Sequence, residues 1–281
     1  MEKVSLFGAG FIGGKYVETY PDEVDIVPRN KILAANNNIL YLISTIHNYL
    51  PKEGRVYEDI ETNLVCFVRI LDNNANENTV FNLVSTWFVY GETPLPAKES
   101  ACCNPKGFYS ITARAREQLL ISYCETYNIK YRIIRLGNVI GVGDKKISIK
   151  KNALQHFCRE LAQGRDIEIY NKSSVRDYTD VRDVVSAIHL ILEKGETSQI
   201  YNVANGRGLS VKDLIYHAWV CSDYSGEITE VPTSGFHKIV QTDAMYLDIS
   251  KIKSLGYIQR HDIKQSVAEL VHYYQNETVK I

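Results

Sequence analysis

The sequence predicts an α/β fold: a doubly wound parallel sheet followed by a small α/β cap in the C-terminal half of the chain. Two observations indicate this fold. Short β-branched or aromatic runs alternate with amphipathic stretches, which is typical of β-α-β units with parallel strands. A glycine-rich turn joins the first run to the first amphipathic stretch. With 281 residues and 45% hydrophobic content, the chain is long enough to bury a substantial core.

The predicted elements follow in order along the chain. The expected strands are 3–7, 24–27, 39–44, 80–86, 131–136 and 200–203, and the expected helices are 11–20, 59–71, 109–127 and 181–194. The span 28–38 is too short for a full helical crossover, so either its helix is cut to one turn or a strand boundary is misplaced. After residue 136 a Gly/Lys-rich loop, a helix at 152–163, short strands and a helix at 263–276 follow. We therefore predict a first domain at 1–140, to which 176–205 return, and a cap formed by 141–175 and 206–281.

The composition argues against several classes of protein. A net charge of −1 disfavours a nucleic-acid binder, because such proteins carry a basic surplus. No apolar run reaches the ~18 residues of a membrane span, and the N-terminal residues enter a strand in place of a signal peptide, so we expect a cytoplasmic protein. The six cysteines form no CxxC or Cys/His zinc pattern, which indicates reduced thiols and no metal site.

The segment VSLFGAGFIGG carries the clearest chemical signal. Gly8, Gly10 and Gly13 stand between an apolar strand and a helix start, the context of a Rossmann-type dinucleotide-binding turn. Gly8 allows the tight turn, Gly10 lets the backbone approach a pyrophosphate, and Gly13 lets the helix pack on the strand. The helix start, at Phe11 and Ile12, supplies N–H groups for the anion. The first domain is thus predicted to bind NAD or NADP, with a substrate bound by the cap.

The choice between the two cofactors depends on the end of the second strand. The acidic residue that usually holds the adenosine ribose is absent from VDIVPRN, where Pro28 and Arg29 stand. A cation there can pair with a 2′-phosphate, so Arg29 favours NADP over NAD; an exposed arginine without a ligand is the alternative. Ser44, at the end of the third strand, is expected to line the same cofactor site.

Three further strings lie in a fixed order: STWFVYG at 85–91, FYSITARAREQLL from residue 108, and RLGNVIG at 135–141. With the glycine turn they resemble the extended short-chain dehydrogenase/reductase family, particularly its nucleotide-sugar epimerase, dehydratase and reductase branch. VRDYTDVRDVVSAI, IYNVANG and DISKIKSLGY are also similar to that branch, so the resemblance covers nearly the whole chain. It implies an NAD(P)-dependent enzyme that moves hydride at a carbon of a nucleotide-diphosphate sugar.

The resemblance implies two catalytic side chains. In that family a Ser or Thr at a strand end and a Tyr on the next long helix hold the oxygen that is oxidised or reduced. Thr86 and Tyr109 match those positions. Thr86 would hydrogen-bond the sugar hydroxyl, and Tyr109 would exchange its proton beside the nicotinamide. Purely structural roles for both side chains are the alternative.

The family's lysine, four residues after the tyrosine, is replaced by Ala113. That lysine would share a helix face with Tyr109, lower its pKa and reach the nicotinamide ribose. Arg114 points off that face, and Arg116, two turns along, is expected to lie too far away to substitute. Three interpretations remain: an enzyme that relies on the charge of the oxidised nicotinamide, a slowed or specialised enzyme, or a degenerate, non-catalytic binding protein.

A second departure narrows the reaction. Family members that eliminate water carry an Asp-Glu pair directly after the threonine, where Trp87 and Phe88 stand here. Neither side chain can transfer a proton, so a 4,6-dehydratase is disfavoured. A nucleotide-sugar epimerase or keto-sugar reductase is the leading hypothesis. A non-catalytic NAD(P) or nucleotide-sugar binding protein and a reductase of a non-sugar carbonyl are the alternatives.

The resemblance also implies a site for the nucleotide diphosphate. Asn138 matches the family's Asn after the sixth strand. Arg176 matches its phosphate-binding Arg, for which a salt bridge to Asp177 or Asp180 is the alternative. Lys238 stands where a second phosphate-binding side chain is expected. Asp180 and Asp183 precede a helical run and are predicted to cap it.

The resemblance implies a dimer as well. In the family, the helices equivalent to 59–71 and 109–127 often pair across a two-fold axis. Leu64, Phe67, Val68 and Leu71 would serve either such an interface or the core of the monomer. We therefore expect a homodimer.

Overall fold

The computed structural model describes residues 2–45, 55–145, 147, 152–170, 174–224, 226–233, 235 and 242–278. The strands of its central sheet are β1 (Val4–Phe7), β2 (Val24–Val27), β3 (Asn38–Tyr41), β4 (Val80–Thr86), β5 (Lys130–Leu136) and β10 (Gln199–Val203). They lie in the order β10-β5-β4-β3-β1-β2, and every neighbouring pair is parallel. The predicted parallel α/β sheet is therefore confirmed, with its third strand ending at Tyr41 where the sequence suggested residue 44.

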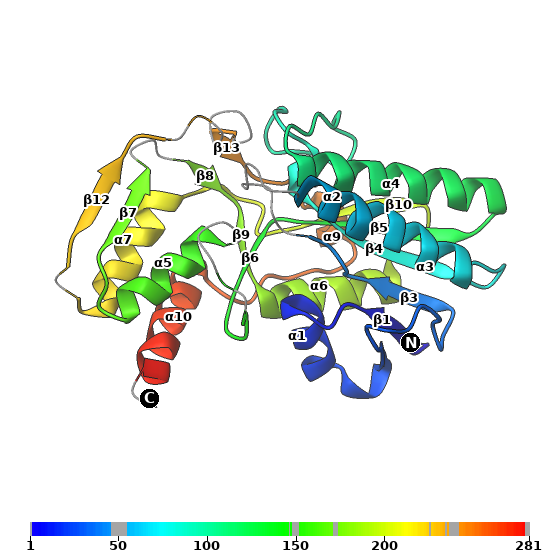
Figure 1. Cartoon of the computed structure of the whole chain (residues 1–281), viewed down its shortest axis with the longest axis horizontal. Helices are drawn as coiled ribbons and strands as arrows, with labels where there is room; N and C mark the ends of the chain where they lie inside the picture. Colours follow the sequence, from blue (N-terminus) through cyan, green and yellow to red (C-terminus); the bar gives the residue numbers. More distant parts are fainter. Residues whose placement is uncertain are drawn as a thin grey trace.

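Helices cover both faces of this sheet (Figure 1). They are α1 (Phe11–Thr19), α2 (Arg55–Ile60), α3 (Cys66–Asn74), α4 (Phe108–Tyr127), α6 (Val181–Lys194) and α9 (Ser250–Ser254), with single turns η1 (Pro21–Glu23), η2 (Glu61–Val65) and η3 (Trp87–Val89). One apolar core fills the space between the sheet, α3 and α4, and a second fills the space between the sheet, α1 and α6. Burial on both faces explains why the strands are apolar runs without alternation.

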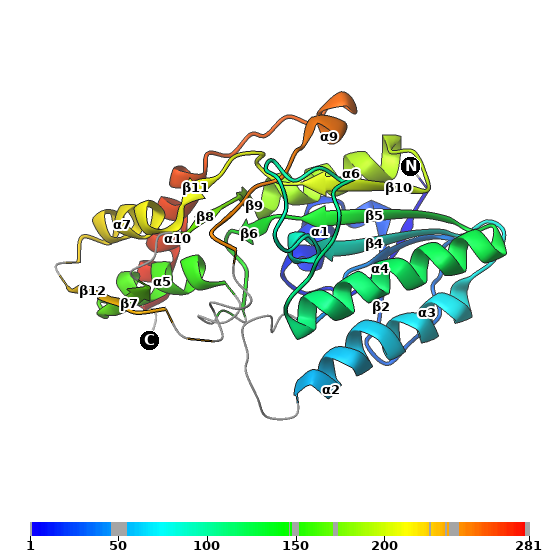
Figure 2. The same ribbon diagram turned by 90° about the horizontal axis from the view of Figure 1, so that it is seen from above.

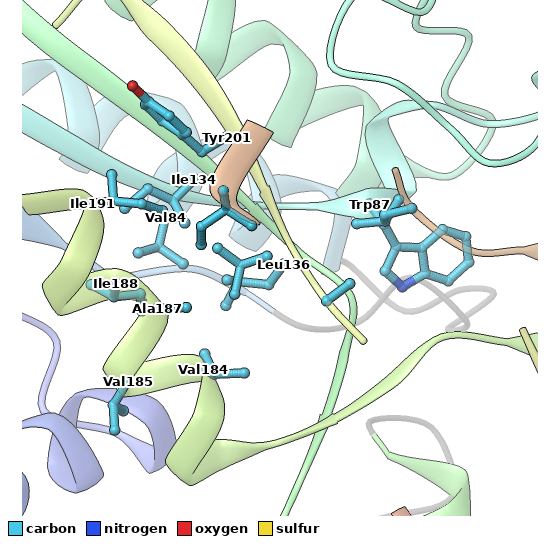
Figure 3. Close-up of a cluster of buried hydrophobic side chains, with 14 of the residues drawn as sticks. Val84, Trp87, Ile134, Leu136, Val184, Val185, Ala187, Ile188, Ile191 and Tyr201 are labelled. Atoms are coloured by element: carbon cyan, nitrogen blue, oxygen red, sulfur yellow. The ribbon is translucent and has the colours of Figure 1, made fainter. Parts of the chain in front are cut away.

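Figure 3 shows the second of these cores. Side chains of β4 and β5 meet those of α6 there, and Trp87 lies at one end of the cluster. The residues drawn and labelled are Val84, Trp87, Ile134, Leu136, Val184, Val185, Ala187, Ile188, Ile191 and Tyr201. This packing fixes the carboxyl ends of β4 and β5, from which the candidate site residues emerge.

The connection from β2 to β3 crosses the sheet without a helix. Residues 28–37 are all described and none is helical, so the one-turn helix considered from the sequence is absent; β2 lies where it was predicted, and β3 begins one residue earlier and ends three residues earlier than expected. Side chains bind the backbone of this segment instead: Ser5 Oγ accepts hydrogen bonds from the N–H groups of Ala35 (2.9 Å) and Asn36 (2.8 Å). Asn74 accepts from the Ala34 N–H at 2.6 Å.

The cap is a smaller α/β unit beyond the carboxyl ends of the strands (Figure 1). Its helices α5 (Ala153–Ala162), α7 (Val211–Ser222) and α10 (Ile263–Thr278) pack on one another around a separate apolar core. Its short strands are β6 (Asn138–Ile140), β7 (Ile167–Tyr170), β8 (Val175–Arg176), β9 (Tyr178–Asp180), β11 (Leu209–Ser210), β12 (Ile228–Val231) and β13 (Ala244–Met245). The exact domain boundaries given above remain predictions. Among the described residues, no helix has the length and apolar character needed to cross a bilayer.

Candidate active site

The glycine turn between β1 and α1 has the geometry that its sequence predicts. Gly8 has a φ of +100°, a conformation that favours glycine, and a Cβ there would lie 2.9 Å from the backbone nitrogen of Ile43. A Cβ on Gly13 would lie 2.2 Å from the Gly8 carbonyl oxygen, so this helix approaches the turn too closely for any side chain. By contrast, a Cβ on Gly10 would meet nothing within 4 Å. The space in front of Gly10 is therefore open.

The start of α1 fits an anionic group. Gly10 caps the helix, no side chain caps its first turn, and that turn contains no acidic residue. The N–H groups of Phe11 and Ile12 therefore stand at a helix N-terminus of positive polarity that no carboxylate of the turn neutralises. These residues fit the pyrophosphate of a dinucleotide.

Arg29 leaves the same edge of the sheet. β2 pairs with β1 so that Val27 lies beside Phe7, and Arg29 follows two residues after Val27. Its side chain is exposed, and no ion pair is found for it within the described part of the chain. The guanidinium is thus available to a ligand that lies along the glycine turn.

Tyr109, Thr86 and Ser44 come together from three elements. Thr86 ends β4, Ser44 follows the end of β3, and Tyr109 is the second residue of α4. The side chains of Thr86 and Ser44 lie close enough to the Tyr109 phenol to lower its pKa. The Thr86 hydroxyl also accepts a hydrogen bond from the Phe88 N–H at 3.3 Å, which fixes its rotamer. Because parallel strands end at one edge of a sheet, these hydroxyls meet on the side where the glycine turn lies.

The charge around Tyr109 differs from the sequence-based expectation. Burial raises the pKa of the Tyr109 phenol, whereas the positive charge of Arg116 is the strongest opposing influence. The prediction that Arg116 lies too far away is therefore wrong. Seven residues are close to two helical turns, so both side chains lie on one face of α4, and a long helical side chain extends toward the N-terminus. Ala113, between them, is completely buried.

A row of aromatic side chains leads from Tyr109 toward the cap. Phe88 meets Tyr109 edge-on, with ring centroids 6.1 Å apart, and stacks on Trp87 at 3.8 Å. The Trp87 indole N–H donates to Asn138 Oδ1 at 3.3 Å. The Arg176 guanidinium lies over the Trp87 ring, 5.6 Å from its centroid. The predicted catalytic pair and the predicted diphosphate-binding side chains are therefore joined through two adjacent aromatic residues.

Arg176 is buried and bound to carbonyl oxygens. Its Nη1 donates to Val175 O at 2.8 Å and its Nη2 to Thr242 O at 2.7 Å. The salt bridge to Asp177 or Asp180 considered from the sequence does not form. The Asp177 carboxylate instead accepts the backbone N–H groups of 205, 206 and 247, and Asp180 binds Arg182. The role of Arg176 toward phosphate remains a prediction, and Lys238 lies outside the described residues.

Asp180 occupies the N-cap position of α6. Its Oδ1 accepts the Arg182 N–H at 2.8 Å. The predicted capping role is therefore confirmed for Asp180, whereas the Asp183 carboxylate accepts the backbone N–H groups of Arg260 and His261.

The sequence matches that of a known protein family. The pattern that defines the NAD dependent epimerase/dehydratase family covers residues 39–204. The chain belongs to this family. Membership of the extended short-chain dehydrogenase/reductases, expected from the motifs, is thereby confirmed.

Individual relatives of this chain agree with that assignment. The GDP-6-deoxy-D-mannose reductase of Pseudomonas aeruginosa is 30% identical over 140 residues, which are 48% of this chain and 46% of that protein. Two solved structures share the fold over 99% of this chain and 100% of theirs. They are RMD from Pseudomonas aeruginosa complexed with NADPH (TM-score 0.84, 20% identity) and the UDP-glucose 4-epimerase of Thermotoga maritima with UDP-glucose (TM-score 0.80, 22% identity).

The sequence did not reveal a polar cluster beside Tyr109. Asn63, completely buried in η2, accepts from Ser44 Oγ (3.1 Å) and donates to Thr112 Oγ1 (3.0 Å). It also donates to Thr45 Oγ1, which in turn donates to the Asp59 carboxylate. The cluster fixes the Ser44 hydroxyl against Tyr109. No local pattern reveals it, because its members come from α2, η2, α4 and the segment after β3.

Proposed function

We propose that this protein is an NAD(P)-dependent epimerase or keto-sugar reductase that acts on a nucleotide-diphosphate sugar by hydride transfer at a sugar carbon. The contact of Tyr109 with Thr86 and Ser44, at the sheet edge that carries the glycine turn, is the observation that carries the proposal. Membership of the epimerase/dehydratase family and the similarity to a GDP-6-deoxy-D-mannose reductase support it.

The cofactor would lie along the carboxyl edge of the sheet. Gly8 and Gly10 leave room for its pyrophosphate, and the N–H groups of Phe11 and Ile12 bind the phosphate oxygens. The bound nicotinamide would supply or accept the hydride. The exposed Arg29 supports NADP as the preferred form, because a guanidinium pairs with a 2′-phosphate.

The protonation state of Tyr109 favours reduction as the first step. Burial raises the pKa of its phenol, so the group is protonated near neutral pH in the free protein. A protonated phenol can give its proton to the oxygen of a ketone as that oxygen becomes an alkoxide. Thr86 would hydrogen-bond the same oxygen. An epimerase must first remove a proton from the sugar hydroxyl, and therefore needs the phenolate. The same residues would serve epimerisation once the phenol has lost its proton.

The nucleotide diphosphate would lie between the sheet and the cap. Asn138 and Arg176, at the far end of the aromatic row from Tyr109, are our proposed ligands for it. Trp87 and Phe88 occupy the space between the two ends and carry no group that transfers a proton. This arrangement leaves dehydration of the sugar without an acid or a base. We also propose that the protein acts as a homodimer.

The decisive experiment is a turnover assay. Purified protein with NADH or NADPH is offered a panel of nucleotide-linked keto-sugars and sugars, and nicotinamide absorbance and products are followed. Replacing Tyr109 with Phe is expected to lower kcat on the order of 10²–10⁴-fold, because the proton donor is lost. Cofactor affinity should stay near that of the original protein. Binding of cofactor without any turnover would instead favour a non-catalytic binding protein.

A second variant tests the substrate class. Arg176→Ala should raise KM for a nucleotide-diphosphate sugar by about tenfold or more and leave cofactor affinity intact, because a charge-assisted pair with phosphate is lost. Arg207→Ala, which removes an exposed cap arginine, is the control. An unchanged KM in Arg176→Ala would favour a reductase of a non-sugar carbonyl. Thermal melting shows whether the loss of the carbonyl contacts of Arg176 also weakens the fold.

A further inference from the structure

Arg116 is a buried cation without an acidic partner. It is 1% exposed, and within the described residues no carboxylate lies at ion-pair distance from it. Its neighbour Glu117 is bound through both oxygens by Arg135, at 3.0 and 2.7 Å, so that carboxylate is already neutralised. Its Nε is buried without a hydrogen-bond partner. Such a group is costly to bury, which calls for a reason beyond packing.

Two strand ends hold the guanidinium in place. Nη1 donates to the Ile43 carbonyl at 2.8 Å and Nη2 approaches the Val84 carbonyl at 3.4 Å. Its carbon lies 5.9 Å from the Tyr41 ring centroid and 6.0 Å from that of Phe67. The positive charge therefore has one fixed position, under the carboxyl ends of β3 and β4.

That position adjoins the candidate proton donor. Ile43 and Val84, whose carbonyls bind Arg116, lie one and two residues before Ser44 and Thr86, whose hydroxyls contact the Tyr109 phenol. Ala113 stands between Tyr109 and Arg116 on the same helix face and adds no charge of its own. The guanidinium thus lies beneath the strand ends from which Ser44 and Thr86 approach the phenol.

The other groups that face the phenol do not supply positive charge. β3 and β4 contribute the hydroxyls of Ser44 and Thr86, and α2 contributes Asp59, whose negative charge opposes ionisation. Arg116 itself faces Tyr41 and Glu117 besides Tyr109. Among the described residues, the guanidinium is the one cation that acts on this phenol.

We propose that Arg116 is a positioning residue that replaces the electrostatic role of the absent helix lysine by holding a fixed positive charge behind Tyr109. The inference builds on the proposed function and refines the role of that same site. It assigns to Arg116 the stabilisation of the phenolate that forms when Tyr109 gives up its proton. It assigns no contact with the nicotinamide ribose, because the guanidinium is already bound to two strand-end carbonyls.

The test measures ionisation of Tyr109 directly, in protein without cofactor or substrate. Tyrosine labelled at Cζ is incorporated, the Tyr109 signal is assigned by its loss in Tyr109→Phe, and its NMR shift is followed with rising pH. Arg116→Gln should raise the pKa of Tyr109 by about one unit or more, because the amide can still donate to a carbonyl but carries no charge. Arg116→Lys should leave the pKa close to its original value. Adding Ala113→Lys to Arg116→Gln should lower it again.

Arg132→Met is the matched control. Arg132 is also a buried arginine, with its Nε donating to Gly195 O at 2.9 Å and its Nη1 to Asn82 Oδ1 at 3.0 Å. It lies toward the amino end of β5, away from the site, so Arg132→Met should leave the pKa of Tyr109 unchanged. Circular dichroism confirms the fold of each variant at each pH, and Arg116→Met replaces the Gln variant if that one does not fold.

The proposal would be overturned if the Tyr109 NMR shift changed with pH in the same way in the original protein and in the neutral Arg116 variant. This includes the case in which the phenol ionises in neither protein before unfolding. The pH dependence of oxidation of the sugar alcohol gives a second readout. At a fixed pH below the Tyr109 pKa, the rate should fall about tenfold per unit of pKa increase and recover as pH is raised. If the oxidation rate of the Arg116 variant does not recover as pH is raised, Arg116 has a purely structural role. Absence of turnover with a clear NMR difference rejects the proposed function alone, whereas turnover without that difference rejects this inference alone.

Discussion

Three glycines at the start of α1, Gly10, Gly13 and Gly14, have different steric surroundings at the residue scale. Gly13 touches backbone, Gly10 faces open space, and Gly14, one position further along α1, has its nearest neighbour at 4.0 Å, the Ala9 carbonyl oxygen. Substitution by alanine therefore separates a requirement of the fold from a requirement of the ligand.

Alanine at these positions should give three distinct outcomes. Gly13→Ala should lower stability by about 1–3 kcal/mol, because its Cβ would overlap the Gly8 carbonyl. Gly10→Ala should leave the melting temperature unchanged but weaken NAD(P) binding by about tenfold or more, because the methyl group occupies the pyrophosphate space. Gly14→Ala should change neither property adversely. Calorimetric titration and thermal melting measure both, and tight cofactor binding by Gly10→Ala would show that the cofactor lies elsewhere.

The structural role of a single residue was predictable where it depends on the residue's immediate neighbours in the sequence. The positive φ of Gly8 and the N-cap role of Asp180 follow from such local rules and are confirmed. The position of Arg116 was not predictable from residue spacing alone. Helical periodicity gives the face on which a side chain lies, but the two carbonyls that draw this guanidinium inward belong to strands far away in sequence.

At the element scale, α3 and α4 lie side by side on one face of the sheet (Figure 2). They bury one side and expose apolar groups on the other. Of the residues considered for an interface, Phe67 and Leu71 belong to the core, whereas Val68 is 37% exposed. Further exposed apolar side chains on α2, η2 and α4 are Val56, Tyr57, Ile60, Val65, Phe108, Ile111, Leu119 and Tyr127. An exposed apolar face of this kind on adjacent helices is typical of an interface between subunits.

A charge on this face should dissociate the proposed dimer. Ile111→Glu places a carboxylate on the exposed side of α4, where Ile111 is 48% exposed, so the monomer fold should remain intact. Ile258→Glu, at a position that is 72% exposed and outside these helices, is the control. Light scattering coupled to gel filtration should give a dimer for the original chain and the control and a monomer for Ile111→Glu. A monomeric original chain would reject the dimer.

Whole elements were predictable where strand-like runs and helix-like stretches alternate along the chain. The six central strands and α1, α4 and α6 lie where the sequence placed them, within a few residues. Helix α7 was missed even though Ser210 accepts the Asp213 N–H in a standard N-cap. The helix-free crossover at 28–37 depends on bonds from Ser5 and Asn74, which no local pattern reveals.

At the scale of the whole molecule, Asp180 joins the sheet domain to the cap. It caps α6 and accepts the Ser266 hydroxyl of α10 at 2.7 Å. Arg182 donates to Asp180 at 2.8 Å and to Glu269 of α10 at 2.7 Å. Burial by itself would raise the pKa of the Asp180 carboxyl, but the hydrogen bonds from Arg182 and Ser266 outweigh burial and hold that pKa below its usual value.

This carboxylate should make the junction sensitive to acid. Since the pKa of Asp180 is lower in the folded than in the unfolded state, its stabilisation is present above the unfolded value of about 4 and is lost as pH falls below it. Asp180→Asn should therefore lower the free energy of unfolding on the order of 1–3 kcal/mol at neutral pH, and by less in acid. Urea denaturation at several pH values measures the difference, and Asp166→Asn, an exposed carboxylate in the cap, is the control. A difference that does not change with pH would contradict this assignment.

The stacked pair of Trp87 and Phe88 gives the protein a built-in optical probe. The chain contains two tryptophans, and the second, Trp219, lies in the cap with its indole N–H bound to Gly226 O. In a Trp219→Phe background, all indole emission originates from the row between Tyr109 and Arg176. Nicotinamide arriving at one end and a nucleotide at the other would each alter that emission, so the order in which the two ligands bind can be followed without a label.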